Sequence, residues 1–435
     1  MSHAPSVRLL AARTVAAVLS GRSLKAALAP AEQGIKDPRD RALLHTIVLA
    51  TIRGSLRWRA ALAPLLSRPL PARARPVEAA LIAALAQIED LDMPAHAVVD
   101  ETVAAIRCLG FAGHAGLGNA ILRRWLRERE QRLALLDKDP EAASGLPAWW
   151  LAQLRADWPD HWRQIVEAGN QPAPMWLRVN SRQISRDNYR QQLLAAGIQA
   201  TIEPDLPQAL RLATPVPVAQ LPGFAQGLAS VQDGAAQYAA ALLAPESGQR
   251  VLDACAAPGG KSAHILELCP DLAELLALDL TPARLQTLQS TLDRLQLPAS
   301  TMVADATEPT TWWDGRHFDR ILVDAPCSAT GILRRQPDVR LHRRGSDIPA
   351  LVAQQERLLD ALWPLLASGG RLVYAVCSVL PAESSAVLAR ILAGHDDARL
   401  LPVTIAGAQA LPAGVQILPG TRDMDGFAYG VLEKR

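Results

Sequence analysis

The spacing of apolar residues divides the chain into a helical first third and a later part in which strands and helices alternate. Val7, Leu10, Val15 and Val18 recur at the spacing of one helix face. Before residue 140 the sequence has no alternating apolar and polar run of the kind that indicates half-buried strands. Further helices are predicted within 36–54, 76–89, 94–109 and 116–133. Together they predict a compact helical bundle.

The middle of the chain predicts a small α+β module. Residues 135–150 are polar and contain Pro140, Gly145 and Pro147, a composition typical of a linker. Beyond this stretch we expect a strand at 175–180, a helix at 185–196 and a strand at 198–203. The Pro-rich residues 214–224 would connect this module to the rest of the chain.

From about residue 230, apolar runs separated by helical stretches predict a doubly wound parallel sheet, which is a Rossmann-like α/β fold. The expected strands are 250–254, 274–280, 300–304, 319–325 and 371–376, with 426–434 as an added edge strand. The expected helices are 261–269, 282–296 and 350–366. The predicted domains are therefore an all-α domain over 1–140, a linker with a small α+β module over 141–228, and the α/β domain over 229–435.

Composition indicates a reducing compartment. The five cysteines are scattered and form no CxxC pair, so we expect neither a disulfide framework nor a bound metal. The first 15 residues lack the apolar core of a signal peptide. No run approaches the ~20 apolar residues that span a bilayer. We expect a cytoplasmic monomer without a membrane partner.

The formal net charge is only +2, but it is unevenly distributed. Residues 1–140 hold 20 Lys and Arg against 13 Asp and Glu. Six arginines fall between Arg53 and Arg75 with no acid among them, and Trp58 lies within this stretch. A basic stripe with an interleaved aromatic suits a nucleic-acid backbone. The alternative is a solvated helix face.

Polar residues stand at the ends of the predicted parallel strands, the edge where such sheets bind ligands. Gly259 and Gly260 open a helix after the first strand, where backbone can approach an anionic group. Asp279, Asp305 and Asp324 end or follow the next three strands. Singly, each aspartate is more typical of a cap or a turn. At one sheet edge, they favour a nucleoside cofactor held at its sugar, base and amine.

The residues around this turn argue against two common nucleotide sites. A P-loop needs glycine five residues before Gly260, and the chain has Cys255 there. The GxGxxG fingerprint of dinucleotide sites is missing as well. S-adenosylmethionine remains as the expected cofactor.

Two cysteines lie at the same predicted edge. Cys327 follows Asp324 by three residues, and Cys377 ends the last parallel strand. An unpaired cysteine is more often a small core residue. Two thiols beside an acid and a methyl donor nevertheless suit methylation of cytosine C5, because a thiolate that adds to C6 makes C5 nucleophilic.

Three segments resemble motifs of the RNA cytosine-C5 methyltransferase family. They are DACAAPGGKS (253–262), VDAPCSATG (323–331) and YAVCSVLPAE (374–383), with further matches at SVQDGAAQ (230–237) and DGFAYG (425–430). The helical third resembles the antitermination factor NusB, more by pattern than by motif. The resemblance is to bacterial members, and it implies S-adenosylmethionine as cofactor, 16S ribosomal RNA as partner, and a covalent bond between cysteine and cytosine C6.

The resemblance implies a role for each matching residue. Cys377 corresponds to the nucleophile, and such a thiol is expected to be partly exposed. Cys327 corresponds to the cysteine that assists proton removal and product release, and Asp324 to a contact with both the target cytosine and the methionyl group. The expected cofactor contacts are Cys255, Ala256, Ala257, Pro258, Gly259, Gly260 and Lys261, with Asp279 on the ribose, Asp305 near the adenine, and Arg284 on the same side. Lys261 would also position Asp324.

Two positions depart from the family pattern. Val376 replaces the usual threonine before the nucleophile, and Ala428 replaces an aromatic residue of the last motif. Both leave the fine geometry of the pocket in question.

The segment 331–345 adds arginines 334, 335, 340, 343 and 344 just after the Cys327 loop. We expect these arginines to contact phosphates, although a solvated loop would also fit. Two other functions are considered, an inactive RNA-binding assembly protein and a methyltransferase for tRNA or protein. The complete cofactor turn, the three aspartates and both cysteines argue against the first, since a scaffold needs none of them.

Overall fold

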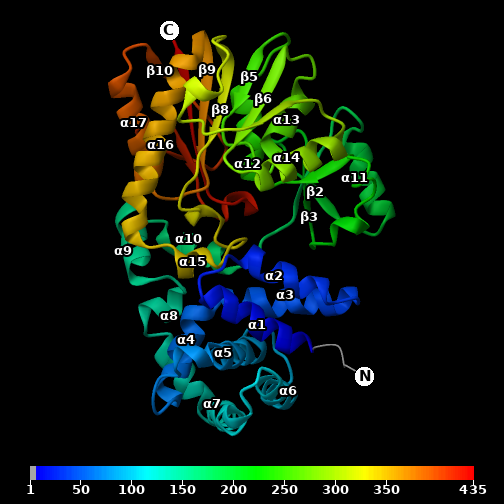
Figure 1. Ribbon diagram of the computed structural model, residues 1–435, viewed down its shortest axis with the longest axis vertical. Coiled ribbons are helices and arrows are strands. Elements are labelled where there is room, and N and C mark those ends of the chain that lie inside the picture. Colours follow the sequence, from blue (N-terminus) through cyan, green and yellow to red (C-terminus); the bar gives the residue numbers. More distant parts are fainter. Residues whose placement is uncertain (1–5) are drawn as a thin grey trace. The chain divides into compact units, whose positions relative to one another are not determined.

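The computed structural model describes residues 6–435, which form two compact units (Figure 1). The first unit holds the described residues up to Gln171 together with Leu333–Gly345. The second holds Pro172–Ile332 and Ser346–Arg435. The predicted boundaries after 140 and 228 divide the chain differently, and they stay a prediction. Residues 1–5 of the stretch considered for a signal peptide lie outside the described residues.

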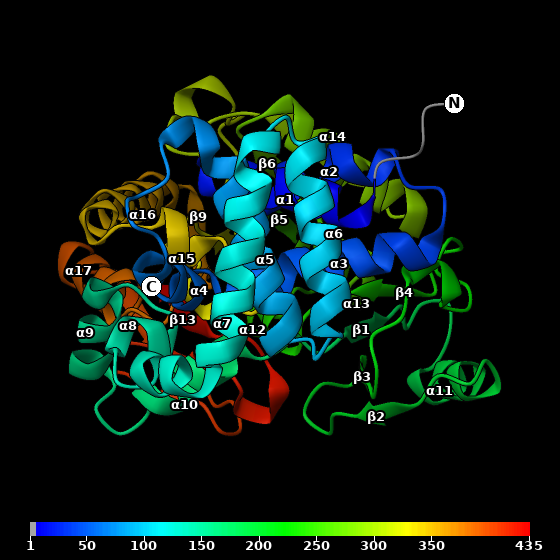
Figure 2. The same ribbon diagram turned by 90° about the horizontal axis from the view of Figure 1, so that it is seen from below.

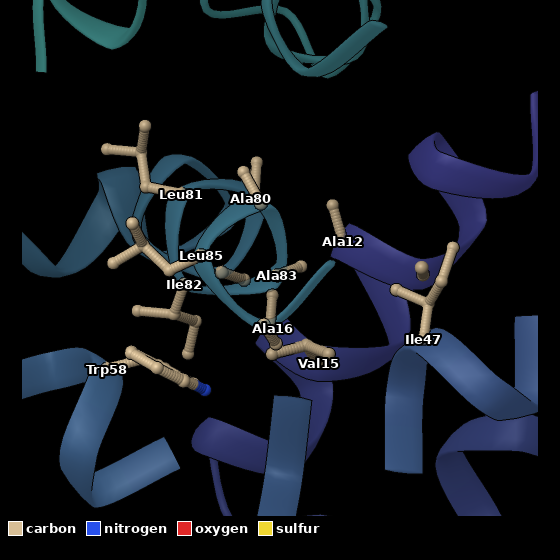
Figure 3. Close-up of a cluster of buried hydrophobic side chains, with 14 of the residues drawn as sticks. Ala12, Val15, Ala16, Ile47, Trp58, Ala80, Leu81, Ile82, Ala83 and Leu85 are labelled. Atoms are coloured by element: carbon tan, nitrogen blue, oxygen red, sulfur yellow. The ribbon is translucent and has the colours of Figure 1, made fainter. Parts of the chain in front are cut away.

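The first unit is helical, as predicted. Helix α5 is central, because its alanines and leucines are buried on almost every side from Val77 to Ile88. Leu81, Ile82 and Leu85 of this helix pack with Trp58 and Val15 in the core (Figure 3). Helices α6 and α7 lie side by side (Figure 2). The helices are α1 (Val7–Leu19), α2 (Leu24–Gln33), α3 (Pro38–Arg53), α4 (Ser55–Leu62), α5 (Arg75–Glu89), α6 (Ala95–Cys108), α7 (Ala115–Leu136), α8 (Pro140–Ser144), α9 (Ala148–Asp157), α10 (Trp162–Asn170) and α15 (Val339–His342).

The predicted linker at 135–150 is wrong, because this stretch is folded into the first unit. The Asp139 side chain accepts hydrogen bonds from the first turn of α8, and Pro140 occupies its N-terminal turn. Gly145 ends the helix in the left-handed conformation at φ 66°. The proline and glycine that favoured a linker therefore cap a short helix.

Trp58 does not contribute an aromatic surface to the basic stripe. Its side chain is only 1 % exposed and meets Trp125 edge-on at 6.2 Å between ring centroids. Its indole nitrogen donates a hydrogen bond to Asp90 at 2.9 Å. The expected interleaved aromatic is thus part of the helical core, whereas Arg68 and Arg73 of the same stretch are exposed.

The returning segment Leu333–Gly345 corrects the prediction that all five of its arginines face phosphates. Arg340 is buried, and its guanidinium donates hydrogen bonds to the carbonyl oxygens of Arg53, Gly145 and Gly169 and to the Asn170 side chain. A guanidinium that is committed to four protein acceptors is unavailable to RNA. Arg334 is buried as well. Phosphate contact stays a prediction for arginines 335, 343 and 344.

The second unit contains the predicted doubly wound sheet. Its strands run in the order β11-β12-β13-β9-β8-β5-β6-β7, and β10 pairs with β13. The five strands from β9 to β7 are parallel, and β13 joins them as an antiparallel strand. The strands are β5 (Arg250–Asp253), β6 (Glu274–Asp279), β7 (Ser300–Val303), β8 (Phe318–Asp324), β9 (Leu366–Val376), β10 (Ala398–Leu401), β11 (Gln409–Ala410), β12 (Val415–Ile417) and β13 (Phe427–Lys434).

Helices cover both faces of this sheet, so the inner residues of its central strands are mostly apolar and buried. One face packs against α12 (Gly234–Leu243), α13 (Gly260–Leu268) and α14 (Pro282–Leu295), and the other against α16 (Ile348–Leu362) and α17 (Ser385–Gly394) (Figure 1). After β5 the chain moves to β6 on one side, and later to β8 on the other. This change of direction is the point where open α/β sheets bind ligands.

The small module is a second, four-stranded sheet. Its order is β2-β3-β1-β4, and every neighbouring pair is antiparallel. The predicted strands and helix are present, but β3 lies between the two predicted strands, so they do not pair directly as in a βαβ unit. The elements are β1 (Trp176–Val179), α11 (Arg186–Ala195), β2 (Ala200–Ile202), β3 (Ala209–Leu212) and β4 (Ala229–Val231).

Over residues 6–435 no helix combines the length and apolarity needed to cross a bilayer.

Candidate active site

The turn between β5 and α13 is held by backbone and side-chain contacts. Gly259 adopts φ 96°, a conformation that favours glycine. A Cβ atom there would also lie 3.2 Å from the Leu288 side chain. The amide of Ala256 donates to Leu278 on the neighbouring strand. The segment Cys255–Gly260 therefore presents its backbone at the carboxyl end of β5, where the sequence places the cofactor.

Asp279 provides the test of whether a ribose would fit beside this turn. Its side chain is 3 % exposed, and Oδ2 accepts a hydrogen bond from the Ala257 amide at 3.2 Å. Within residues 6–435, Oδ1 has no hydrogen-bond partner, although the Arg284 guanidinium forms an ion pair with it at 3.2 Å. A buried carboxylate oxygen without a hydrogen bond is unfavourable in the protein alone. A ribose hydroxyl would satisfy it.

The other predicted cofactor residues differ in their surroundings. Arg284 also donates to the Ala257 carbonyl at 3.2 Å, so it supports the turn from α14. Asp305 is exposed, and its carboxylate accepts the amide and hydroxyl of Thr307. Asp305 therefore forms the kind of turn that is the structural alternative to a ligand-binding role for each of the three aspartates.

Lys261 and Asp324 form an ion pair at 2.5 Å between Nζ and Oδ2. Lys261 is in the first turn of α13, and Asp324 ends β8, so the pair joins the cofactor turn to the strand that leads to Cys327. Lys261 also lies over the Phe427 ring at 5.1 Å. The structure thus shows the predicted contact of Lys261 with Asp324, and it leaves this carboxylate 29 % exposed.

The two predicted cysteines meet. Cys327 Sγ and Cys377 Sγ are 3.4 Å apart, and both residues are half-buried. The parallel register of β8 and β9 pairs Asp324 with Ala375, which brings the two following loops together. The partial exposure expected of Cys377 is observed. The pKa of the Cys327 thiol is raised well above its ordinary value, first by its hydrogen bond with Cys377 and then by burial.

Sequence reasoning missed the hydroxyl groups behind the thiols. Ser328 and Ser378 follow the two cysteines directly, and both hydroxyls donate to the buried carboxylate of Glu383. The repeated Cys-Ser pair in the sequence was the available signal.

Two glycines also fix the Cys377 loop. The Gly331 amide donates to the Cys377 carbonyl at 2.9 Å, and the Gly426 amide donates to the Gly331 carbonyl at 2.8 Å. A Cβ atom on Gly331 would lie 2.2 Å from the Gly426 oxygen, so only glycine fits there.

The small module contacts the turn between β5 and α13 through Arg178. Its guanidinium donates to the Gly260 carbonyl at 2.6 Å and forms an ion pair with Glu267.

The two departures from the family pattern are neighbours. Val376 on β9 and Ala428 on β13 are partners in the antiparallel register, and both are buried in the same core cluster. The pair is apolar and lies next to Cys377 at the end of β9.

Asp253 lies behind the cofactor turn and gives a testable pH dependence. Burial is the main cause that raises its pKa to about 7, against a hydrogen bond from Ser262 that lowers it. Between pH 4 and 7 the folded protein keeps a proton that the unfolded chain has released, so the free energy of unfolding falls as pH rises through this window. We expect Asp253→Asn to lose less stability than the unsubstituted protein between pH 5 and 8, measured as the midpoint of urea unfolding. Equal losses in the two proteins would contradict this assignment.

The fold has clear structural relatives. The crystal structure of the protein PH0851 superimposes with a TM-score of 0.83 at 21 % identity, over 98 % of this chain and 99 % of that chain. This likeness concerns the fold alone. A methyltransferase homologue from Pyrococcus horikoshii has a TM-score of 0.61 at 27 % identity, over 69 % of this chain and 99 % of its own. The second unit thus has the Rossmann-like fold of a methyltransferase.

Sequence comparison then gives the family. Family models match at 240–433 (16S rRNA methyltransferase RsmB/F), 146–219 (the ferredoxin-like domain of RsmF/B-like methyltransferases) and 5–127 (NusB family). Ribosomal RNA small subunit methyltransferase B of Xanthomonas campestris is 47 % identical, over 98 % of this chain and 97 % of its own. The protein of that name from Vibrio cholerae is 44 % identical, over 99 % and 98 %. The chain belongs to the ribosomal RNA small subunit methyltransferase B family, which confirms the resemblance drawn from its motifs.

Proposed function

We propose that this protein methylates C5 of a cytosine in small-subunit ribosomal RNA, with S-adenosylmethionine as the donor and through a covalent bond between Cys377 and C6. The observation that carries the proposal is the contact between the Cys327 and Cys377 sulfurs beside Asp324. Methylation at a pyrimidine carbon needs a nucleophile that adds and a base that removes a proton, and this pair supplies both.

The cofactor would be held by residues of the cofactor turn. The backbone of Cys255–Gly260 would lie along it, Asp279 Oδ1 would accept a ribose hydroxyl, and Asp305 would lie toward the adenine. When bound, S-adenosylmethionine supplies an electrophilic methyl group. Lys261 holds Asp324 at the rim, where its carboxylate can accept a hydrogen bond from the cytosine.

The contact between the thiols bears on which of them attacks C6 and which accepts the C5 proton. In the free protein the raised pKa of Cys327 favours its protonated form, so the attack on C6 is assigned to Cys377, whose sulfur lies 3.4 Å away. Once Cys377 is bonded to C6, its sulfur is neutral and a weak acceptor. The largest cause of the raised pKa of Cys327 is then weakened, and once this thiol has released its proton to solvent, its thiolate would accept the C5 proton. Loss of that proton re-forms the C5–C6 double bond and expels Cys377.

The helical unit is proposed to bind the RNA backbone. Arg68 and Arg73 are exposed, and Arg68 lines a cavity of about 500 Å³ together with Arg59 and Arg75. Positively charged side chains at such a hollow attract phosphates.

The double variant Arg68→Ala, Arg73→Ala tests this binding surface. It should weaken rRNA binding and reduce the slope of log affinity against log salt by about 2, because two phosphate contacts are lost. Arg190→Ala, which removes an exposed arginine from α11, is the matched control. Filter binding at several salt concentrations measures both quantities. An unchanged slope in the double variant would contradict this role.

The proposed activity is tested with S-adenosylmethionine labelled in the methyl group. The protein is incubated separately with naked 16S rRNA, with tRNA and with cell protein, and nucleosides of the labelled RNA are analysed. We expect label in the rRNA as 5-methylcytosine. Label in tRNA or protein would assign another substrate, and no label in any of them would favour an RNA-binding assembly protein.

A further inference from the structure

Glu383 is a buried carboxylate that contacts both cysteine loops. It ends the short 3-10 helix Pro381–Glu383 and is 0 % exposed. Oε1 accepts the Ser328 amide at 2.8 Å and the Gln355 side-chain amide at 3.2 Å. Oε2 accepts the hydroxyls of Ser328 at 2.5 Å and Ser378 at 2.6 Å. One carboxylate thus binds the residue after Cys327 and the residue after Cys377.

Further contacts close this arrangement into a network. The Thr330 hydroxyl lies 3.0 Å from both the Ser328 and the Ser378 hydroxyl, and it accepts the Val379 amide. Tyr374 donates its hydroxyl to the Glu383 carbonyl at 2.6 Å. Gln355 also donates to the Pro326 carbonyl, just before Cys327. The two loops that carry the thiols are therefore tied to one point.

Packing does not explain why a carboxyl group stands at position 383. Over the described part of the chain it forms no ion pair with Lys, Arg or His, and four neutral donors compensate its burial instead. Ionised carboxylates are costly to bury, and an apolar side chain would fill a core more cheaply. A carboxylate offers about four lone-pair sites on two oxygens, whereas an amide oxygen or a hydroxyl offers about two. This capacity is what joining two loops requires.

We propose that Glu383 is a positioning residue that fixes Cys327 and Cys377 relative to each other during methyl transfer. The inference rests on the proposed function and deepens it. C5 and C6 of a cytosine are bonded neighbours, so attack at one and proton removal at the other need both sulfurs at a defined separation. The 3.4 Å contact between the sulfurs is the observed separation, and Glu383 binds the backbone amide of Ser328 on one side of it and the side-chain hydroxyl of Ser378 on the other.

Kinetics of Glu383→Gln and Glu383→Ala test the proposal. The alanine variant should lower kcat about 100-fold, since displacement of reacting groups by about 1 Å has that effect. The glutamine variant, which keeps one acceptor oxygen, should lose less. KM for S-adenosylmethionine should stay within about twofold in both, because Glu383 does not touch the cofactor turn. Asn180→Ala removes a similarly buried polar side chain from the small module and is the control for general destabilisation.

A second readout does not depend on methylation. Diamide oxidises two adjacent thiols to a disulfide and is itself reduced to the hydrazine, so the rate of Cys327–Cys377 disulfide formation reports how closely the sulfurs are held. Peptide mass spectrometry should show this rate falling about tenfold in Glu383→Ala and unchanged in Asn180→Ala. If the alanine variant does not fold, the Glu383→Gln variant tests the proposal, and both its kcat and its rate of disulfide formation are expected to fall.

The outcomes separate this inference from the proposed function. An unsubstituted protein that makes no 5-methylcytosine refutes the proposed function, while the disulfide assay still tests the geometry. Glu383 variants with unchanged kcat, with losses no larger than those of Asn180→Ala, or with an unchanged disulfide rate would overturn the inference.

Discussion

Cys377→Ala is expected to abolish both methylation and the covalent protein–RNA complex. Without the thiolate no bond forms at C6, and C5 stays too weak a nucleophile to accept a methyl group. We expect turnover to fall by about 10⁴-fold or more, as it does when a covalent nucleophile is removed. Methyl incorporation into rRNA and gel analysis of the complex measure the two effects. Affinity for S-adenosylmethionine should be unchanged, because Cys377 lies outside the cofactor turn.

Cys327→Ala should give the opposite result for the covalent complex. Attack by Cys377 survives, but the thiol that removes the C5 proton is missing, so the methylated RNA stays attached. We expect turnover to fall by about 10²- to 10⁴-fold, the usual contribution of general acid–base catalysis, while the complex accumulates. The position of Cys327 supports this assignment, because its sulfur lies 3.4 Å from the Cys377 sulfur. Accumulation in Cys377→Ala instead would mean that the roles are exchanged.

The doubly wound sheet was predictable because strands such as β6 and β8 are buried on both faces and therefore read as largely apolar runs. Strand-end chemistry followed from the same topology, since parallel strands such as β8 and β9 bring Asp324 and Cys377 to one edge. The identity of the cofactor and the division of work between the thiols came from motifs rather than from pattern.

What sequence patterns could not give is tertiary contact. Arg340 and Trp58 carry the chemistry of RNA-binding residues, but partners distant in sequence bury them, Asn170 in one case and Asp90 in the other. The local contact of Glu383 with Ser378 does not reveal its role, because this role also depends on Ser328, which is 55 residues away along the chain. Such contacts are invisible to local propensity and appear only when the fold brings the segments together.

The central claim is that Cys377, rather than Cys327, bonds to the cytosine. The most direct measurement is peptide mapping of the covalent complex formed by Cys327→Ala with 16S rRNA and S-adenosylmethionine, after digestion with nuclease and trypsin. We predict a methylated cytidine nucleotide attached to the peptide that contains Cys377. The complex should be lost when Cys377 is also replaced. A nucleotide on any other residue, or no complex while Cys327→Ala still turns over at the unsubstituted rate, would contradict the account.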